Sequence, residues 1–230
     1  AEMLLNEGEI IIDATNNVKS KLFSSLAAEK RSIIYLSAYA TKSCFSFYSG
    51  KCKDSSVDFN LHFRDSKQGN LNSMVCSAIL VDELRKKVMP LEDDLLLGDF
   101  THSAISEKDV LEKKVLQVGA GAIGTFSALA LSLSGADLTI MDFDRIEENN
   151  LNRQFLFYDK IGENKAEALA ERLKKYSHKI KEIDEKIKWD FNPTGYDFVF
   201  SCVDNIEARF FINLAAQKYN VPVIDGGSSL

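Results

Sequence analysis

Short apolar runs, each separated from the next by polar turns and amphipathic segments, recur along this chain. In its second half the runs Val115–Val118, Leu138–Met141, Phe198–Ser201 and Val221–Ile224 are apolar at most positions. Such runs are typical of parallel strands that are covered on both faces. Because helix-like segments separate them, the pattern predicts an α/β fold with a Rossmann-like, mostly parallel sheet and helices on both faces.

Part of this pattern occurs twice. Residues 8–38 and 196–226 align without a gap, and each reads as an apolar strand, a polar turn, an amphipathic helix and a second apolar strand. In the polar turn Asn17 falls on Asn205, and in the helix Lys21 falls on Arg209. We interpret the match as an internal repeat, which divides the fold into two related units. The copies differ in their acids, because Asp204 corresponds to Asn16 and Asp225 corresponds to Ser37.

The region between the copies suggests a domain boundary. Residues 42–70 partly alternate between aromatic and polar positions, as expected for strands joined by turns, and Leu71–Val88 has helical spacing. The acidic stretch that follows Pro90 reads as a connector. We predict a first unit over residues 1–93, a linker over 94–110 and a second unit over 111–230. Neither unit has enough strands to cover its helices, so we expect two incomplete domains and a fragment of a longer protein.

Composition excludes several classes of function. The net charge is −6, and no apolar run approaches the ~18 residues of a membrane-spanning helix, so we expect neither nucleic acid nor a membrane as partner. The four cysteines form no C-x-x-C pair, which leaves a structural zinc site without support. We expect free thiols and a reducing, cytoplasmic location.

A glycine-rich turn follows the first apolar strand of the second unit. Gly119, Gly121 and Gly124 form G-x-G-x-x-G, in which glycine permits a tight turn, backbone approach to phosphate, and close packing of helix on strand. Backbone N–H groups at the start of the following helix stabilise phosphate oxygens. Asp142 ends the next strand, at the distance expected of an acid that binds ribose hydroxyls. These positions predict a nucleotide site.

A second group of polar residues suggests phosphate chemistry. It consists of Asn150, Arg153, Gln154 and Lys165, which follow Asp142 closely in the chain. Arginine and lysine beside a phosphate site favour stabilisation of charge on a transferring or leaving phosphate. Asp204 ends the apolar strand FVFSCVD, where a carboxylate facing phosphates is typical of a magnesium ligand.

These segments together resemble a known family. GAGAIG, MDFDRIEENNLNRQFLF, IGENKAEAL and SCVDNIEARFFINLAAQKYNVPVIDGG resemble the adenylation domain of ubiquitin-activating enzymes and the adenylyltransferases of molybdopterin and thiamine biosynthesis. The match runs almost continuously from Val115 to Gly227 and in family order. The resemblance implies that a protein carboxyl terminus attacks ATP, which yields an acyl-adenylate and pyrophosphate. A thiol can then capture the acyl group.

The resemblance also implies roles for individual residues. ATP phosphates would lie on the glycine loop, ribose on Asp142 and Mg²⁺ on Asp204; the catalytic contacts to phosphate would come from Asn150, Arg153, Gln154 and Lys165. The expected partners are a ubiquitin-like protein, a conjugating enzyme and a second adenylation-like domain, paired within one chain or in a dimer. The first copy has Asn16 at the position that Asp204 occupies in the second copy, which agrees with an inactive first copy and an active second copy.

Some family features have no match in this sequence, and two other functions compete. We find no counterpart of the arginine that a partner domain supplies, no paired zinc cysteines and no cysteine after Cys202 that could form a thioester. An NAD-dependent oxidoreductase would explain the glycines and Asp142, but it gives no role to the polar group that follows. A non-catalytic module that binds a ubiquitin-like protein is the other alternative.

Overall fold

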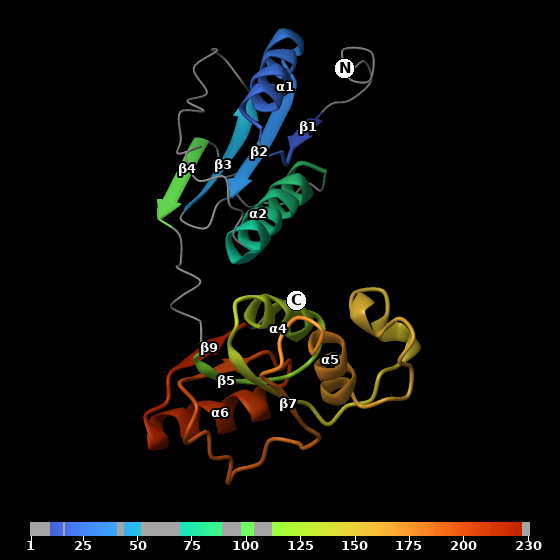
Figure 1. Cartoon of the computed structure of the whole chain (residues 1–230), viewed down its shortest axis with the longest axis vertical. Coiled ribbons are helices and arrows are strands. Elements are labelled where there is room, and N and C mark those ends of the chain that lie inside the picture. Colours follow the sequence, from blue (N-terminus) through green and yellow to red (C-terminus); the bar gives the residue numbers. More distant parts are fainter. Residues whose placement is uncertain are drawn as a thin grey trace. The chain divides into compact units, whose positions relative to one another are not determined.

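The chain forms two compact units, residues 1–106 and 107–230 (Figure 1). The structure is a computed structural model, and it describes residues 10–15, 17–40, 44–51, 70–88, 98–103 and 112–226. No helix within these ranges is both long and apolar enough to cross a membrane.

The first unit is a four-stranded mixed sheet with two helices. Its elements are β1 (Ile10–Asp13), α1 (Val18–Arg31), β2 (Ile34–Ala40), β3 (Cys44–Lys51), α2 (Asn70–Val88) and β4 (Gly98–Ser103). The strand order is β1-β2-β3-β4; β1 and β2 are parallel, whereas β3 is antiparallel to both of its neighbours. The predicted parallel pair of strands at residues 10–13 and 33–36 is therefore confirmed.

The two faces of β2 contribute to two separate cores. Leu36 and Ala38 pack with Leu80 of α2, whereas Tyr35, one position along, packs with Ala28 of α1. Because side chains alternate across a strand, this division places α1 and α2 on opposite faces of the sheet. The helix predicted at Leu71–Val88 is confirmed as α2.

The prediction of a connector over residues 94–110 is wrong at Gly98–Ser103. These residues form β4, which pairs with β3 along its whole length, from Ser49↔Gly98 to Cys44↔Ser103. Backbone hydrogen bonds to a neighbouring strand decide edge pairing, and an acidic composition does not preclude them. Of the strands predicted between residues 42 and 70, β3 is observed, and residues 52–69 lie outside the described ranges.

The second unit is a five-stranded parallel sheet with helices on both faces. Its elements are β5 (Lys114–Val118), α4 (Ala122–Leu133), β6 (Asp137–Met141), η2 (Glu148–Asn150), η3 (Phe155–Phe157), α5 (Lys165–Leu173), β7 (Ile180–Ile183), β8 (Phe198–Ser201), α6 (Ile206–Tyr219) and β9 (Val223–Asp225). The strand order is β7-β6-β5-β8-β9, with every pairing parallel. The predicted α/β fold is confirmed.

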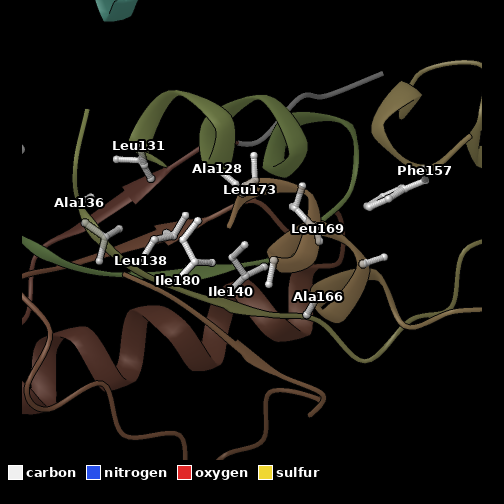
Figure 2. Close-up of a cluster of buried hydrophobic side chains, with 14 of the residues drawn as sticks. Ala128, Leu131, Ala136, Leu138, Ile140, Phe157, Ala166, Leu169, Leu173 and Ile180 are labelled. Carbon is white, nitrogen blue, oxygen red and sulfur yellow. The ribbon is translucent and has the colours of Figure 1, made fainter. Parts of the chain in front are cut away.

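Two hydrophobic cores hold the three layers of this unit together. On one face α4 and α5 cover the sheet through a cluster that includes Leu131, Leu138, Ile140, Leu169 and Leu173, and Figure 2 shows their side chains converging. On the other face α6 packs through a second cluster, in which Ile212 meets residues of β5 and β8 (Figure 1). Burial of both faces explains why the strands are apolar at nearly every position.

The ends of the sheet depart from the prediction. β7 was not predicted, because its sequence IKEI has only two apolar positions, as expected for an edge strand. The final strand begins at Val223 rather than Val221, because the Val221 N–H donates to the Ala216 carbonyl and so completes the end of α6. Pro222 has no N–H to donate to a neighbouring strand.

The internal repeat is confirmed by the register of the strands. In the first unit Ile11 pairs with Tyr35, and in the second Val199 pairs with Val223, so both partners are shifted by the same 188 residues. The helices between them also begin in the same way. Asn17 and Asn205 are the N-caps of α1 and α6; the side chain of Asn17 accepts two backbone N–H groups and that of Asn205 accepts one.

The two repeat helices also end alike. Ser32 follows α1 and Asn220 follows α6 at the equivalent position, and both are left-handed, with φ of 56° and 53°. A left-handed residue after the last turn closes a helix through its own backbone N–H. The polar turn and the helix end of the repeat are therefore structural features of one shared unit.

Candidate functional site

A cavity of about 870 Å³ opens at the carboxyl ends of β5, β6 and β8. Strand order reverses between β5 and β8, and ligands of open parallel sheets bind in the crevice at such a point. Eight of the nine predicted site residues line the cavity: Gly119, Gly121, Asp142, Asn150, Arg153, Gln154, Lys165 and Asp204. Gly124 is the exception. The volume is within the range of small-molecule sites.

The first glycine of the motif has a backbone conformation that other residues rarely adopt. Gly119 has φ of +99°, and a Cβ there would lie 2.6 Å from the carbonyl oxygen of Cys202. Its N–H donates to the Met141 carbonyl at 2.8 Å. Gly119 therefore lets the loop turn sharply between β6 and β8 at the floor of the cavity.

The other two glycines have different reasons to lack a side chain. A Cβ on Gly121, the N-cap of α4, would meet no atom within 4 Å, so the loop presents bare backbone to the cavity. A Cβ on Gly124 would lie 2.1 Å from the Gly119 carbonyl oxygen. Gly121 thus leaves space for a ligand, whereas Gly124 permits the helix to approach the loop.

Gln117 supports the glycine loop from below, a role that the sequence analysis missed. Its side chain is completely buried, and Nε2 donates to the carbonyls of Gly119 (3.0 Å) and Gly124 (2.8 Å). Its Oε1 accepts the hydroxyl of Ser127 at 2.8 Å. A glutamine within an otherwise apolar strand was the available signal, because a buried amide requires partners.

Asp142 joins the end of β6 to the glycine loop. One carboxylate oxygen accepts the Ala120 N–H at 2.6 Å, and the other accepts the Asp144 N–H at 2.8 Å. Burial raises the pKa of Asp142, and the two backbone hydrogen bonds act against that rise. Each oxygen keeps a lone pair, so the carboxylate can also accept hydroxyl groups of a ligand.

Lys165 is held at the cavity by Asp144. Lys165 is the first residue of α5 and is 8% exposed; its ammonium lies 3.0 Å from a carboxylate oxygen of Asp144, and its N–H donates to the Asp144 carbonyl. One of its three ammonium hydrogens is used here, so two can reach a ligand. Asp144 was not singled out by the sequence analysis, because its spacing from Lys165 depends on the fold.

Asn164, also missed, fixes the start of the same helix. It is the N-cap of α5, its Oδ1 accepts the Glu167 N–H, and its Nδ2 donates to the Asp142 carbonyl at 3.0 Å. A polar residue directly before a helical run is the signal of such a cap. Through this side chain the helix carrying Lys165 is joined to the strand end carrying Asp142.

The segment after β6 brings three more predicted residues to the cavity. Asn150 is bonded locally, since its Oδ1 accepts the Glu147 N–H and its Nδ2 donates to Asn149. The exposed Arg153 donates to the carbonyl of Asn149 and the side chain of Asn152. Gln154 is 3% exposed, and its Oε1 accepts no hydrogen bond within the described residues. A buried acceptor without a partner at a cavity wall can bind a ligand donor or water.

Asp204 follows β8 and extends into the cavity as an exposed carboxylate. No hydrogen bond or ion pair from the described part of the chain reaches it. Within the same ranges no three acidic, histidine or cysteine side chains gather closely enough to hold a metal alone. A magnesium ion bound to nucleotide phosphates and waters needs only one or two carboxylates, so Asp204 fits this kind of site.

Cys202 lies beside the cavity and close to Ser127, whose Oγ is 3.5 Å from its Sγ. Burial raises the pKa of the Cys202 thiol. The nucleophilic form of cysteine is the thiolate, so this environment disfavours the thioester role.

We therefore expect iodoacetamide to label Cys202 at pH 7.5 at least about tenfold more slowly in the native protein than in urea. In the native protein the labelling rate should keep rising above pH 9, because the thiol ionises above the ordinary value of 9.0. Peptide mass mapping distinguishes Cys202 from the other three cysteines. Equal rates in the native and unfolded proteins would show that Cys202 is reactive.

Comparisons with known proteins show one family. Residues 94–229 match the model of the ThiF family. Similar curated proteins include Adenylyltransferase and sulfurtransferase MOCS3 of Caenorhabditis briggsae, 32% identical over 58% of this chain and 35% of that protein. Ubiquitin-like modifier-activating enzyme 5 of Drosophila virilis is 32% identical over 52% of this chain and 34% of that protein. SUMO-activating enzyme subunit 2 of Dictyostelium discoideum is 35% identical over 50% of this chain and 19% of that protein.

The chain therefore spans about a third of the length of the first two curated relatives. Solved structures of MccB from E. coli are also similar. The complex with selenomethionine MccA is 27% identical over 53% of this chain and 39% of that chain, with a TM-score of 0.46. The complex with ATP is 28% identical over 52% of this chain and 38% of that chain, also with a TM-score of 0.46.

Proposed function

This chain belongs to the ThiF family, and we propose that its second unit binds Mg·ATP and adenylates the C-terminal carboxylate of a ubiquitin-like protein. The observation that carries the proposal is the cavity, which gathers a glycine loop, a ribose-type acid, several cations including Arg153 and Lys165, and a carboxylate without a partner in the described part of the chain. An oxygen of that C-terminal carboxylate would attack the α-phosphorus of ATP. The bond from that phosphorus to the bridging oxygen would break, and pyrophosphate would leave.

The residues at the cavity suit these steps. We propose that the bare backbone at Gly121 contacts phosphate, and that Asp142 accepts the ribose hydroxyls. Lys165 and Arg153 would stabilise the negative charge that moves onto pyrophosphate. Such cations act strongly where burial lowers the local dielectric constant, as it does around Lys165.

Two further residues would complete the site. The unpaired Oε1 of Gln154 would accept a hydrogen bond from the nucleotide or from an ordered water, and Asn150 would keep its segment in place. Mg²⁺, when bound, supplies charge neutralisation for the phosphates. Asp204 is the residue that would hold it, because its carboxylate lines the cavity and has no partner among the residues that the structure describes.

The proposed partner is a ubiquitin-like protein, and the similarity of this chain to two modifier-activating enzymes supports it. Ubiquitin-like modifier-activating enzyme 5 and SUMO-activating enzyme subunit 2 are both similar to this chain. A thiolate would then attack the acyl carbon of the acyl-adenylate, a thioester would form and AMP would leave. We place that thiol outside the second unit because of the environment of Cys202. A conjugating enzyme is the proposed later acceptor.

The nucleotide separates this proposal from an oxidoreductase. By calorimetry on the full-length protein with magnesium, we expect ATP to bind and NAD to bind at least about tenfold more weakly, a difference of about 1.4 kcal/mol. Asp142→Ala should weaken ATP binding by about tenfold or more, because the ribose hydroxyls and the glycine loop both lose an acceptor.

Asp190→Ala is the matched control, because this exposed acid lies outside the cavity lining and should leave ATP binding unchanged. Tighter binding of NAD than of ATP would contradict the adenylation proposal. ATP binding without ATP–pyrophosphate exchange, tested with candidate ubiquitin-like proteins from the source organism, would favour the non-catalytic binding module.

A further inference from the structure

The repeat places a cation, a hydroxyl and an acid at equivalent positions in both units. Lys21 of α1 corresponds to Arg209 of α6. In the first unit Asp13, the last residue of β1, pairs with Ser37 in the middle of β2; at the equivalent positions of the second unit Ser201 pairs with Asp225. Acid and hydroxyl have thus exchanged strands between the copies, while each copy keeps one of each beside its cation.

In the first unit the cation joins the two parallel strands of the repeat. Lys21 is 1% exposed, and its ammonium donates to Ser37 Oγ at 2.7 Å and to the Ala38 carbonyl at 2.8 Å. It also donates to the Asp13 carbonyl at 3.2 Å and lies 3.4 Å from a carboxylate oxygen of Asp13. These ammonium contacts lie at the end of β1 and within β2, so the ammonium joins the two strands of the sheet.

In the second unit the cation holds the turn instead. Nε and Nη2 of Arg209 donate to the Val203 carbonyl at 3.1 and 3.0 Å, and Nη1 lies 3.8 Å from Asp225 Oδ2. Val203 directly precedes Asp204 in the turn between β8 and α6. Ser201 Oγ, in the place of the first unit's acid, is buried and has no hydrogen-bond partner within the described residues. The guanidinium has therefore turned toward Asp225 and the turn.

We propose that Arg209 and Asp225 are a positioning pair that orients Asp204 toward the cavity, an inference that rests on the proposed role of Asp204. Two N–H donors from a planar guanidinium to one carbonyl restrict the peptide that leads into Asp204. The carboxylate of Asp225 lies 3.8 Å from Nη1 and attracts the guanidinium, which favours this orientation of the arginine. Since this ion pair is partly exposed, its contribution to stability is small, and its effect is on geometry.

The proposal predicts that Arg209 acts through Asp204. In the full-length protein Arg209→Lys should lower ATP–pyrophosphate exchange about tenfold, because one ammonium cannot replace the forked donors. In an Asp204→Asn background the same change should have an effect of less than about twofold, because coupled residues are not additive. Lys218→Ala, in the last turn of α6, is the control and should change neither rate. Equal losses in both backgrounds would overturn the proposal.

A second measurement does not need activity. We expect amide hydrogen exchange at the hydrogen-bonded N–H groups of Cys202 and Ala208, which flank the turn, to become faster in Arg209→Lys while the melting temperature stays within a few degrees. Adding Ser201→Asp and Asp225→Ser to Arg209→Lys recreates in the second unit the arrangement of Lys21, Asp13 and Ser37. This triple variant should leave the turn as mobile as Arg209→Lys alone does, because in the first unit the ammonium of that arrangement joins two strands.

Unchanged amide hydrogen exchange in Arg209→Lys would overturn the positioning role. If the unmodified protein itself shows no pyrophosphate exchange with any carboxylate donor, the proposed function fails. The hydrogen-exchange result then still decides whether Arg209 and Asp225 hold the turn.

Discussion

Asp204→Asn is expected to lower ATP–pyrophosphate exchange roughly a hundredfold or more, the scale of losing one key electrostatic group in an active site. The change removes a full negative charge and a hard oxygen ligand from the position proposed for Mg²⁺. Because Asp204 is exposed and has no partner within the described residues, the folded structure should not depend on it. The loss should therefore occur without a change in melting temperature.

Asn16 supplies the internal control, because it occupies the equivalent position in the first copy. Asn16→Ala should leave exchange within a few-fold of the unmodified protein, apart from any loss of stability. Both variants are measured in the full-length protein with the same carboxylate donor and over a range of magnesium concentrations. Equal sensitivity at the two positions would mean that both copies are active, and the proposed division into an inactive and an active unit would be wrong.

Gly124→Ala is expected to destabilise the second unit by about 3 kcal/mol, at the upper end of the cost of overpacking. The new Cβ would lie 2.1 Å from the Gly119 carbonyl oxygen and 3.1 Å from Nε2 of Gln117. Both contacts belong to the support of the loop, so the backbone must shift and the hydrogen bonds of Gln117 must lengthen. Urea unfolding at several temperatures measures the loss, and ATP binding should disappear with it.

Gly121→Ala separates the contribution of the glycine-rich loop to stability from its contribution to phosphate binding. Its Cβ would meet no protein atom within 4 Å, so the free energy of unfolding should fall by less than about 1 kcal/mol, the cost of alanine at an N-cap. ATP affinity should nevertheless fall roughly tenfold or more, about 1.4 kcal/mol, because a methyl group occupies the place where phosphate approaches the backbone. If Gly121→Ala binds ATP normally, phosphate does not bind at this loop.

The order of elements and the repeat could be predicted from the sequence, because both depend on local patterns. Apolar runs are continuous wherever both faces of a strand are covered, so the strands before Gly119 and before Asp204 were found. The N-cap asparagines Asn17 and Asn205 mark the same turn in both copies. Edge strands such as β4 and β7 escaped prediction, since their stability comes from a neighbouring strand rather than from their own composition.

The glycines, Asp142, Arg153, Lys165 and Asp204 were identifiable from the sequence by their types and spacing, as were their neighbours Asn150 and Gln154. Only the tertiary structure showed that eight of the nine predicted residues line one cavity. It also revealed the supports that spacing does not encode: Gln117 beneath the loop, Asp144 against Lys165, and Arg209 on the Val203 carbonyl. The physical reason is that residue type determines what chemistry a side chain can perform. Its partners are brought to it from distant positions by the packing of strands and helices.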